Sequence, residues 1–291
     1  MSAVVQLLGA NYPTRLAATP DPPGALRVRG ALPIPAADWV IGIVGARAAA
    51  GNTMALARRM AADLVREYGA VIVSGGAVGI DSAAHRGALD AGGSTVAVLA
   101  GGLDAPYPPR NRPLFDEIAR AGGALVSTQP PGTRPLRRLF VARNAVIAGM
   151  CDAVVVVEAQ GGSGSLHTAR AAHRLGRLVA AVPGSPGCEA LLASGAALVE
   201  SAADLASARA GSPRAPSAPL PEAGSREARI LDVLDVVKPA TGAAVAAQSG
   251  LAARDAIRGL AALESDGLAL LVAGQAYLLS PLAVRLRASS T

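Results

Sequence analysis

Several features are scarce or missing in this sequence of 291 residues, and each absence excludes a class of protein. No apolar run reaches the roughly 20 residues that a membrane-spanning helix needs. The first residues, MSAVVQLLGANYPTRL, lack the basic start and long apolar stretch of a secretory signal. The two cysteines, Cys151 and Cys188, lack the CxxC spacing of metal sites, so we expect buried thiols. We therefore expect a soluble cytoplasmic protein without membrane contact, metal or other cofactor.

Lysine is almost absent as well, because Lys238 is the only one and arginine supplies the remaining positive charge. The formal net charge is +6. Residues 1–150 hold 15 Arg and 9 acidic residues, whereas residues 151–224 hold 5 Arg and 6 acidic residues. Residues 225–291 hold 7 basic and 6 acidic residues. The surplus in the first half favours a polyanionic partner such as nucleic acid, with a plain compositional bias as the alternative.

Aromatic residues make up 2% of the sequence, yet one of the two Phe lies among arginines. The segment RPLRRLFVARNAVIAGM (134–150) places Arg134, Arg137, Arg138 and Arg143 around Phe140. Arginines neutralise phosphates, and a ring or guanidinium plane stacks on a base, so this composition suits single-stranded DNA. With one ring, we expect salt-sensitive binding with weak sequence preference. The alternative is a helix whose Phe140 faces the core and whose arginines face water.

Short β-branched runs alternate with helical patterns along residues 39–208. Strands are expected within 39–46, 70–76, 94–102, 124–128, 152–159, 177–184 and 196–201, and helices within 53–69, 81–93, 113–123, 137–150 and 165–176. Strands of this length separated by helices indicate βαβ units and a buried parallel sheet. Right-handed crossovers then give an α/β fold with a Rossmann-like doubly wound parallel sheet.

The flanking segments indicate further parts. We expect residues 1–38 to be an N-terminal extension packing on the core, and residues 39–208 to be the DNA-binding domain. The Pro/Ala/Ser-rich residues 209–224 read as a linker. Residues 225–291 predict a small winged-helix-like domain, with a first helix capped by Ser225 and two strands joined at Ala273–Gly274. Its charge balance of +1 favours protein contact or a structural role over reading of a DNA groove.

Several of the expected strands end in glycine, which allows close approach of a ligand to the backbone. In doubly wound sheets, ligands bind beyond the carboxyl ends of the strands, and helix N-termini there attract anions. Tight turns alone would also explain the glycines. Because Arg47 follows the first strand of this domain, we favour an anion site. Its candidate residues outside the arginine cluster are Gly45, Arg47, Ser74, Gly75, Ser163, Gly164 and Ser165.

Three motifs fall short of a catalytic pattern. The stretch GARAAAGNT (45–53) lacks the spacing and the lysine of a phosphate-binding P-loop. Asp81 and His85 have no nucleophile beside them, so capping and packing roles are favoured. The stretch GGSGSLHTA (161–169) resembles the phosphate loop of lysine-decarboxylase-like phosphoribohydrolases, but His167 and Thr168 stand where carboxylates are required. A nucleotide-processing enzyme of that type is therefore the alternative function, and a ligand sensor that regulates transcription is a weaker third.

Seven segments together resemble one family. They are NYPTRLAATPDPPGALRVRG, GAR, SGGAVGID, TVAVLAGGLDAPYPPRN, FVARNAVIAG, EAQGGSGSLHTA and AVPG. In order and spacing they are similar to the DNA-processing protein A (DprA, also called Smf) family, strongly over residues 8–200. The resemblance implies a homodimeric, non-enzymatic protein that binds and protects incoming single-stranded DNA. It also implies loading of RecA recombinase in natural transformation and recombination.

The resemblance also implies particular DNA contacts. The family pocket maps to Arg47, Arg137, Phe140, Arg143 and Asn144. The family motif is altered at two positions, where Val141 replaces a proline and Ala145 replaces an arginine; Arg134 and Arg138 are hypothesised to supply the lost charge. Family members often carry a helical domain ahead of this region, which we expect this chain to lack. The dimer interface is expected within residues 151–200.

Overall fold

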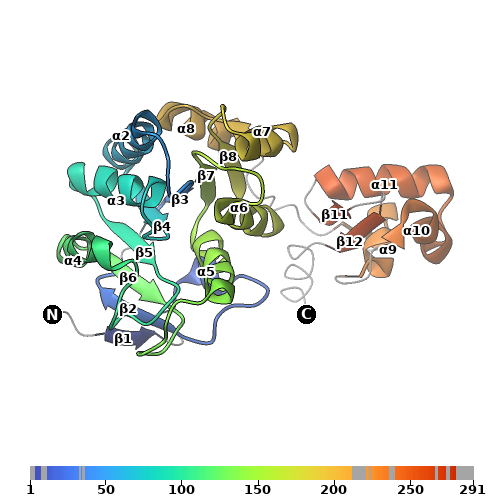
Figure 1. The fold of residues 1–291 in the computed structure, drawn as a ribbon. Coiled ribbons are helices and arrows are strands. Elements are labelled where there is room, and N and C mark those ends of the chain that lie inside the picture. Colours follow the sequence, from blue (N-terminus) through green and yellow to red (C-terminus); the bar gives the residue numbers. More distant parts are fainter. Residues whose placement is uncertain are drawn as a thin grey trace. The chain divides into compact units, whose positions relative to one another are not determined.

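The structure is a computed structural model that describes residues 4–7, 12–32, 34, 37–211, 221–222, 224–235, 240–265, 268–272 and 276–279. The chain divides into two compact units, residues 1–212 and residues 213–291. The first unit is an α/β structure in which helices cover both faces of one sheet (Figure 1). The expected fold class is therefore confirmed for this unit.

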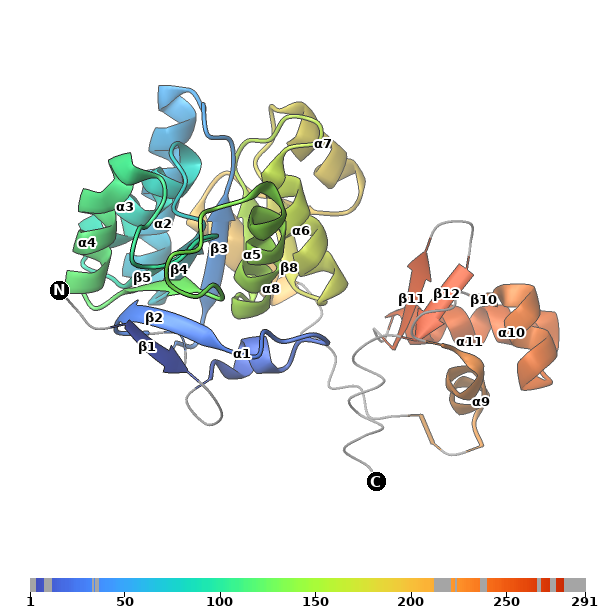
Figure 2. The ribbon, with the colours of Figure 1, turned by 60° about the horizontal axis from the view of Figure 1, so that its bottom comes forward.

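The sheet of the first unit contains nine described strands in the order β1-β2-β6-β5-β4-β3-β7-β8-β9. Their bounds are β1 (Val4–Leu7), β2 (Leu26–Gly30), β3 (Val40–Val44), β4 (Val71–Ser74), β5 (Thr95–Val98), β6 (Ala124–Ser127), β7 (Ala153–Val156), β8 (Leu178–Ala181) and β9 (Ala197–Leu198). Within the part of this order that runs from β6 to β9, all neighbouring strands pair in parallel, as predicted. The N-terminal segment does more than pack on the core, because β2 pairs antiparallel with β6, and β1 with β2 (Figure 2).

Eight described α-helices and one 3₁₀ helix, η3 (Pro109–Asn111), accompany this sheet. Their bounds are α1 (Thr14–Ala17), α2 (Gly51–Tyr68), α3 (Ile80–Asp90), α4 (Arg112–Arg120), α5 (Arg137–Met150), α6 (Gly164–Arg174), α7 (Pro186–Ala193) and α8 (Ala202–Gly211). The helices α7 and α8 were not among the elements expected from the sequence. Because α8 reaches Gly211, residues 209–211 belong to a helix rather than to the expected linker. Residues 212–220 and 223 of that expected linker lie outside the described residues.

The core lies on both faces of the sheet, because side chains alternate along each strand. On β3, Val40 and Val44 face the cluster that includes residues of α5 and α6, whereas Ile41 and Ile43 face the cluster with α2, α3 and α8. The strand β7 is buried on both faces in the same way. Cys151 and Cys188 are free and buried, as expected. Helices α2 and α5 therefore pack on opposite faces.

The second unit contains α9 (Arg226–Val233), α10 (Gly242–Ser249) and α11 (Ala253–Ser265). Its antiparallel sheet has the order β10-β12-β11, formed by β10 (Ala240–Thr241), β12 (Ala276–Leu279) and β11 (Ala269–Val272). The hydroxyl of Ser225 accepts a hydrogen bond from the Ala228 amide at 3.1 Å, so the expected cap is confirmed. The expected turn at Ala273–Gly274 lies outside the described residues, and the winged-helix assignment stays a prediction.

Candidate nucleic-acid interface

The order of the strands indicates where a ligand would bind. From β3 the chain continues to β4 on one side, whereas β7 lies on the other side of β3. The crevice outside the carboxyl ends of two such strands is the usual ligand site of an open α/β sheet. The loop after β3 carries Arg47, and the loop after β7 carries Gly161–Gly164. The predicted anion-site residues thus belong to neighbouring loops at one end of the sheet.

Phe140 lies at this end of the sheet, in the first turns of α5, where its ring is half-buried. The guanidinium carbon of Arg47 lies 5.2 Å from the ring centroid, and that of Arg143 lies 5.6 Å from it. Tyr107 makes an edge-to-face contact with the same ring, with centroids 6.3 Å apart. A ring contacted by two guanidinium groups is stabilised by cation–π attraction. Phe140 is therefore neither a core residue nor a freely exposed ring.

Arg143 is buried, unlike the other arginines of the cluster. Its terminal nitrogen donates hydrogen bonds to the carbonyl oxygens of Gly75 and, at 2.7 Å, of Val98, while Nε donates to the Asn144 side chain at 3.2 Å. Burial lowers the pKa of Arg143 to about 10, against the opposing attraction of the Asp81 carboxylate. Arg143 thus connects α5 to the loop that follows β4 and to the last residue of β5.

Asp81 supports the same arrangement from α3. Its carboxylate accepts a hydrogen bond from the Ala77 amide at 3.2 Å, and burial raises its pKa although Arg143 acts in the opposite direction. The N-cap of α3 is Gly79, so the capping role expected for Asp81 is wrong; the residue lies in the first helical turn. A side chain at Gly75 would overlap both Arg143 and Asp81. This glycine is required by close packing.

Ser74 and Gly45 shape the backbone of the crevice rather than present free groups. The buried hydroxyl of Ser74 donates to the carbonyl oxygen of Ile43 at 2.6 Å, which joins the ends of β3 and β4. A Cβ atom at Gly45 would come within 2.7 Å of Ile80. Ser74 therefore joins β4 to β3, and Gly45 allows the chain after β3 to pack closely against α3.

The loop after β7 is attached to α5 by Asn144. The side-chain amide of Asn144 donates to the carbonyl oxygen of Gly164 at 3.0 Å. The hydroxyl groups of Ser163 and Ser165 lie 2.8 Å apart, with Ser163 half-buried and Ser165 buried. The following residues are His167, which is exposed, and Thr168, which is buried. Residues 161–168 contain no carboxylate, and the acidic residue of the loop, Glu158, precedes them. The structure thus brings Gly164 next to the α5 residue Asn144.

Four arginines of the predicted site are exposed. They are Arg47, Arg134, Arg137 and Arg138. Within the described ranges, the ion pairs involve other arginines and none of these four. The first turn of α5 contains no acidic residue. We call the four arginines together with Phe140 the Phe140 surface; among the described residues, its arginines form no ion pair, although Arg47 lies close enough to the Asp81 carboxylate to lower the pKa of that group.

His85 is buried on α3 and packs inside the unit, as expected. Its Nδ1 lies 2.7 Å from the hydroxyl of Thr95, which itself donates to the carbonyl oxygen of Ile72 at 2.7 Å. Nδ1 therefore carries the proton and donates to Thr95. Burial lowers the pKa of His85 to about 3, with a smaller contribution from Arg143. The imidazole is accordingly neutral at physiological pH.

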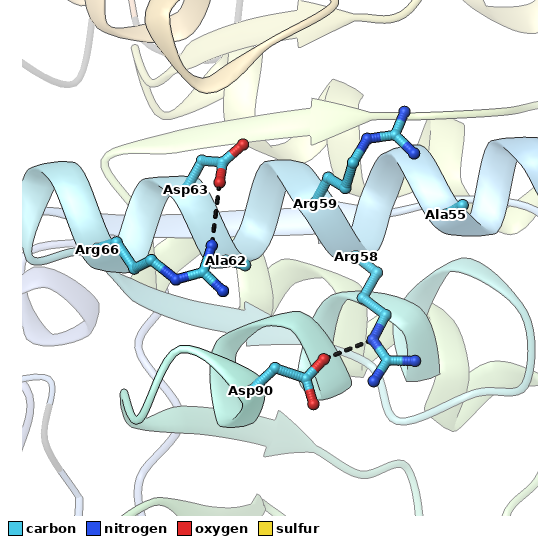
Figure 3. Close-up of a pocket in the computed structure, with 7 residues that line it drawn as sticks. All are labelled: Ala55, Arg58, Arg59, Ala62, Asp63, Arg66 and Asp90. Atoms are coloured by element: carbon cyan, nitrogen blue, oxygen red, sulfur yellow. Dashed lines mark hydrogen bonds and ion pairs between the residues drawn. The ribbon is translucent and has the colours of Figure 1, made fainter.

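A separate depression of about 360 Å³ lies on the outer surface of α2 and α3 (Figure 3). Arg58 pairs there with Asp90 at 2.5 Å, and Arg66 pairs with Asp63 at 3.3 Å. The hydrogen bond from Arg58 lowers the pKa of the Asp90 carboxyl. Because its charges are largely paired and α2 packs on the face opposite α5, this depression is not part of the Phe140 surface.

Two further properties concern the described residues alone. Within them, no group of three or more His, Cys, Asp and Glu side chains is placed to hold a metal ion. None of the described helices has both the length and the apolar character needed to cross a membrane.

Comparison with known proteins gives consistent matches. The sequence profile described as DNA recombination-mediator protein A matches residues 3–210. A putative DNA processing protein DprA from Mycobacterium tuberculosis is 44% identical over 239 residues, which are 78% of this chain and 61% of the relative. DprA from Streptococcus pneumoniae is 41% identical over 205 residues, 68% of this chain and 71% of the relative. The chain thus spans less than two thirds of the M. tuberculosis relative.

Solved structures agree with these sequence matches. The X-ray structure of DNA processing protein A from S. pneumoniae has a TM-score of 0.65 and 38% identity, over 70% of this chain and 74% of that chain. A Helicobacter pylori DNA processing protein A, described for its single-stranded DNA binding mode, has a TM-score of 0.60 and 29% identity. That match covers 65% of this chain and 88% of the other.

Proposed function

The chain belongs to the DNA recombination-mediator protein A family, and from this premise we propose that it binds single-stranded DNA on the Phe140 surface. The observation that carries the proposal is a set of exposed arginines, none of them in an ion pair of the described residues, that lie near the half-buried Phe140 ring in sequence or, for Arg47, directly against it. Arginine forks bind phosphates in bidentate fashion and release counterions from the strand. A guanidinium plane or a ring also stacks on a base without selecting its sequence.

The buried and exposed residues of the predicted site would then have different roles. Arg47, Arg137 and Arg138 contact phosphates, with Arg134 adding charge at the edge. Arg143, which the family motif led us to expect as a direct contact, is a positioning residue in this proposal, because its guanidinium group is buried against carbonyl oxygens. Asn144, Ser74, Gly45 and Gly75 likewise hold the loops in place.

We further propose, on the same premise, that the protein protects incoming single-stranded DNA and loads RecA recombinase on it without performing catalysis. The description of the family as a recombination mediator supports this. If the protein loads RecA, adding it should speed the assembly of RecA filaments on single-stranded DNA that is covered by a single-strand-binding protein. Release of free base from nucleoside monophosphates would instead support the phosphoribohydrolase alternative, which the loop Gly161–Thr168, lacking a carboxylate, disfavours.

A homodimer is also proposed, with its interface within residues 151–200. The strand β9 is an edge of the sheet, and its Leu198 is 58% exposed, an apolar side chain suited to contact with a second copy. Leu198→Asp should halve the mass measured by analytical ultracentrifugation. An unchanged dimer mass would place the interface elsewhere.

The binding proposal is tested by titrating labelled single-stranded and duplex DNA with the 291-residue chain and with its variant Arg47→Glu/Arg137→Glu. The variant should lose most single-strand binding while keeping its unfolding midpoint, since both side chains are exposed. Arg170→Glu/Arg174→Glu is the matched control, because it reverses two exposed arginines on α6. Equal affinity of the first variant and the wild type, or a preference for duplex DNA, would refute the proposal.

A further inference from the structure

The loop between β5 and α4 brings a second aromatic ring to the Phe140 surface. Tyr107 contacts the Phe140 ring edge to face, and its side chain is 46% exposed. Two guanidinium groups already lie against the Phe140 ring, which is only half-exposed. Of these two aromatic residues, Tyr107 is therefore the more accessible to a base.

This loop is fixed in place by hydrogen bonds at both ends. The Asn111 side-chain amide donates to the carbonyl oxygen of Gly76 and to the hydroxyl of Ser82, both at 2.9 Å. At the other end, the Gly102 amide donates to the carbonyl oxygen of Thr133 at 2.9 Å. The ring of Tyr107 is thus held beside the Phe140 surface, which reduces the entropy lost on binding.

The charge around Tyr107 suits a polyanion. Arg110 and Arg112 flank Asn111, both are exposed, and neither takes part in the ion pairs of the described residues. The acidic residue of the loop, Asp104, accepts hydrogen bonds from the Gly132 amide at 3.0 Å. Positive charge therefore continues from the Phe140 surface along this loop.

We propose that the β5–α4 loop is a further segment of the single-stranded DNA site, in which Tyr107 stacks on a base and Arg110 binds the adjoining phosphate. This inference rests on the proposed function and extends it to residues beyond the arginine cluster of α5. The two residues then have different roles: the ring of Tyr107 contacts the face of a base, whereas the guanidinium group of Arg110 contacts the phosphate backbone.

Fluorescence polarisation measures the affinity of the 291-residue chain for a thymidine oligonucleotide and for an abasic oligonucleotide of the same length. Tyr107→Ala should weaken thymidine binding at least about 5-fold, because stacking contributes about 5-fold or more per base. It should leave abasic binding within about 2-fold. Tyr107→Phe should restore wild-type affinity, and Arg110→Gln should weaken binding to both oligonucleotides equally.

The controls separate this inference from the proposed function. Tyr68→Ala removes another exposed tyrosine that makes an edge-to-face contact, with Trp39, at the far end of α2, and it should leave binding unchanged. Tyr107→Leu keeps apolar bulk if Tyr107→Ala unfolds, and it should show the same selective loss. If the wild type binds the thymidine oligonucleotide and both Tyr107→Ala and Tyr107→Leu bind it with the same affinity as the wild type, the inference about Tyr107 is wrong and the proposed function stands. Wild-type protein that ignores both oligonucleotides overturns the proposed function as well.

Discussion

The arginines in the first turns of α5 have the same side chain and different surroundings. Arg143 is buried among carbonyl oxygens and Asp81, whereas Arg137 is exposed without an ion-pair partner within the described residues. Removing this buried cation leaves its carbonyl acceptors without a donor and the nearby Asp81 carboxylate without its compensating charge, at a cost of about 3–5 kcal/mol. We therefore expect Arg143→Met to lose about that much free energy of unfolding in urea. Arg137→Met should change it by less than about 0.5 kcal/mol.

The same pair of variants distinguishes positioning from contact. Adding Asp81→Asn to Arg143→Met should recover part of the lost stability, because the uncompensated carboxylate is then gone. Arg137→Met should weaken DNA binding, and adding Asp81→Asn to Arg137→Met should bring no gain in the free energy of unfolding. A stable Arg143→Met protein with impaired binding would show that Arg143 touches DNA directly.

At His85, the lowered pKa makes stability depend on pH. The folded protein holds the imidazole neutral down to about pH 3, whereas the unfolded chain takes up a proton below about pH 6.5. The contribution of this group is therefore fully present above pH 6.5 and is lost progressively as the pH falls toward 3. Between pH 7.5 and pH 5 the wild type should lose about 2 kcal/mol through this group.

The control for His85 is His85→Gln, which lacks the titrating group. The raised pKa of Asp81 acts in the opposite direction, because the folded state then binds a proton more readily than the unfolded state. Since Asp81 is present in both proteins, its effect largely cancels in the comparison. Urea unfolding at the two pH values measures the difference, and equal pH dependence of the two proteins would contradict the role assigned to His85.

At the scale of elements, α2 and α3 approach closely at Gly87. A methyl group there would overlap the carbonyl oxygen of Arg58 and come within 3.0 Å of the Ala61 side chain. Gly87→Ala should therefore lower the free energy of unfolding by about 1–3 kcal/mol, although alanine favours helices. Gly51→Ala, at the start of α2 with open space around it, is the control and should not destabilise. Equal urea midpoints for Gly87→Ala and Gly51→Ala would contradict the close packing of α2 and α3 at Gly87.

The elements also show which parts of the fold could be predicted from sequence. The strand β7 was predictable because an unbroken apolar run is typical of a strand buried on both faces. The strand β2 also carried a signal, since Leu26 and Val28 alternate with Arg27 and Arg29, but its pairing with β6 joins distant segments. Only the tertiary structure contains that pairing.

The candidate site, too, could be predicted from the sequence only in part. The arginine cluster and Phe140 were predictable from composition, and α5 periodicity could have separated Arg143, which lies on the stripe with Ile147 and Met150, from the exposed arginines. Two residues of the candidate site could not be assigned to it from the sequence around them. Tyr107 reaches Phe140, and Asp81 reaches Arg143, through contacts between different loops and helices.

At the scale of the whole molecule, the charge is divided unequally between the two units. Residues 1–212 hold 19 Arg and 14 acidic residues, whereas residues 213–291 hold 8 basic and 7 acidic residues. Because counterion release depends on phosphate contacts, the first unit should account for the salt dependence of binding. A protein of residues 1–212 should therefore match the full chain in affinity for single-stranded DNA within about 2-fold.

The steepness of that salt dependence gives the number of phosphate contacts. For single strands, the logarithm of the affinity falls with the logarithm of salt concentration by about 0.7 per phosphate neutralised. Contacts from Arg47, Arg134, Arg137 and Arg138 predict a slope of about −3, and Arg110 and Arg112 would steepen it to about −4. Arg137→Gln/Arg138→Gln should make the slope shallower by about 1.4 in both the full chain and residues 1–212. A slope near zero would exclude backbone contact by these arginines, and a shallower slope for residues 1–212 than for the full chain would assign phosphate contacts to the second unit.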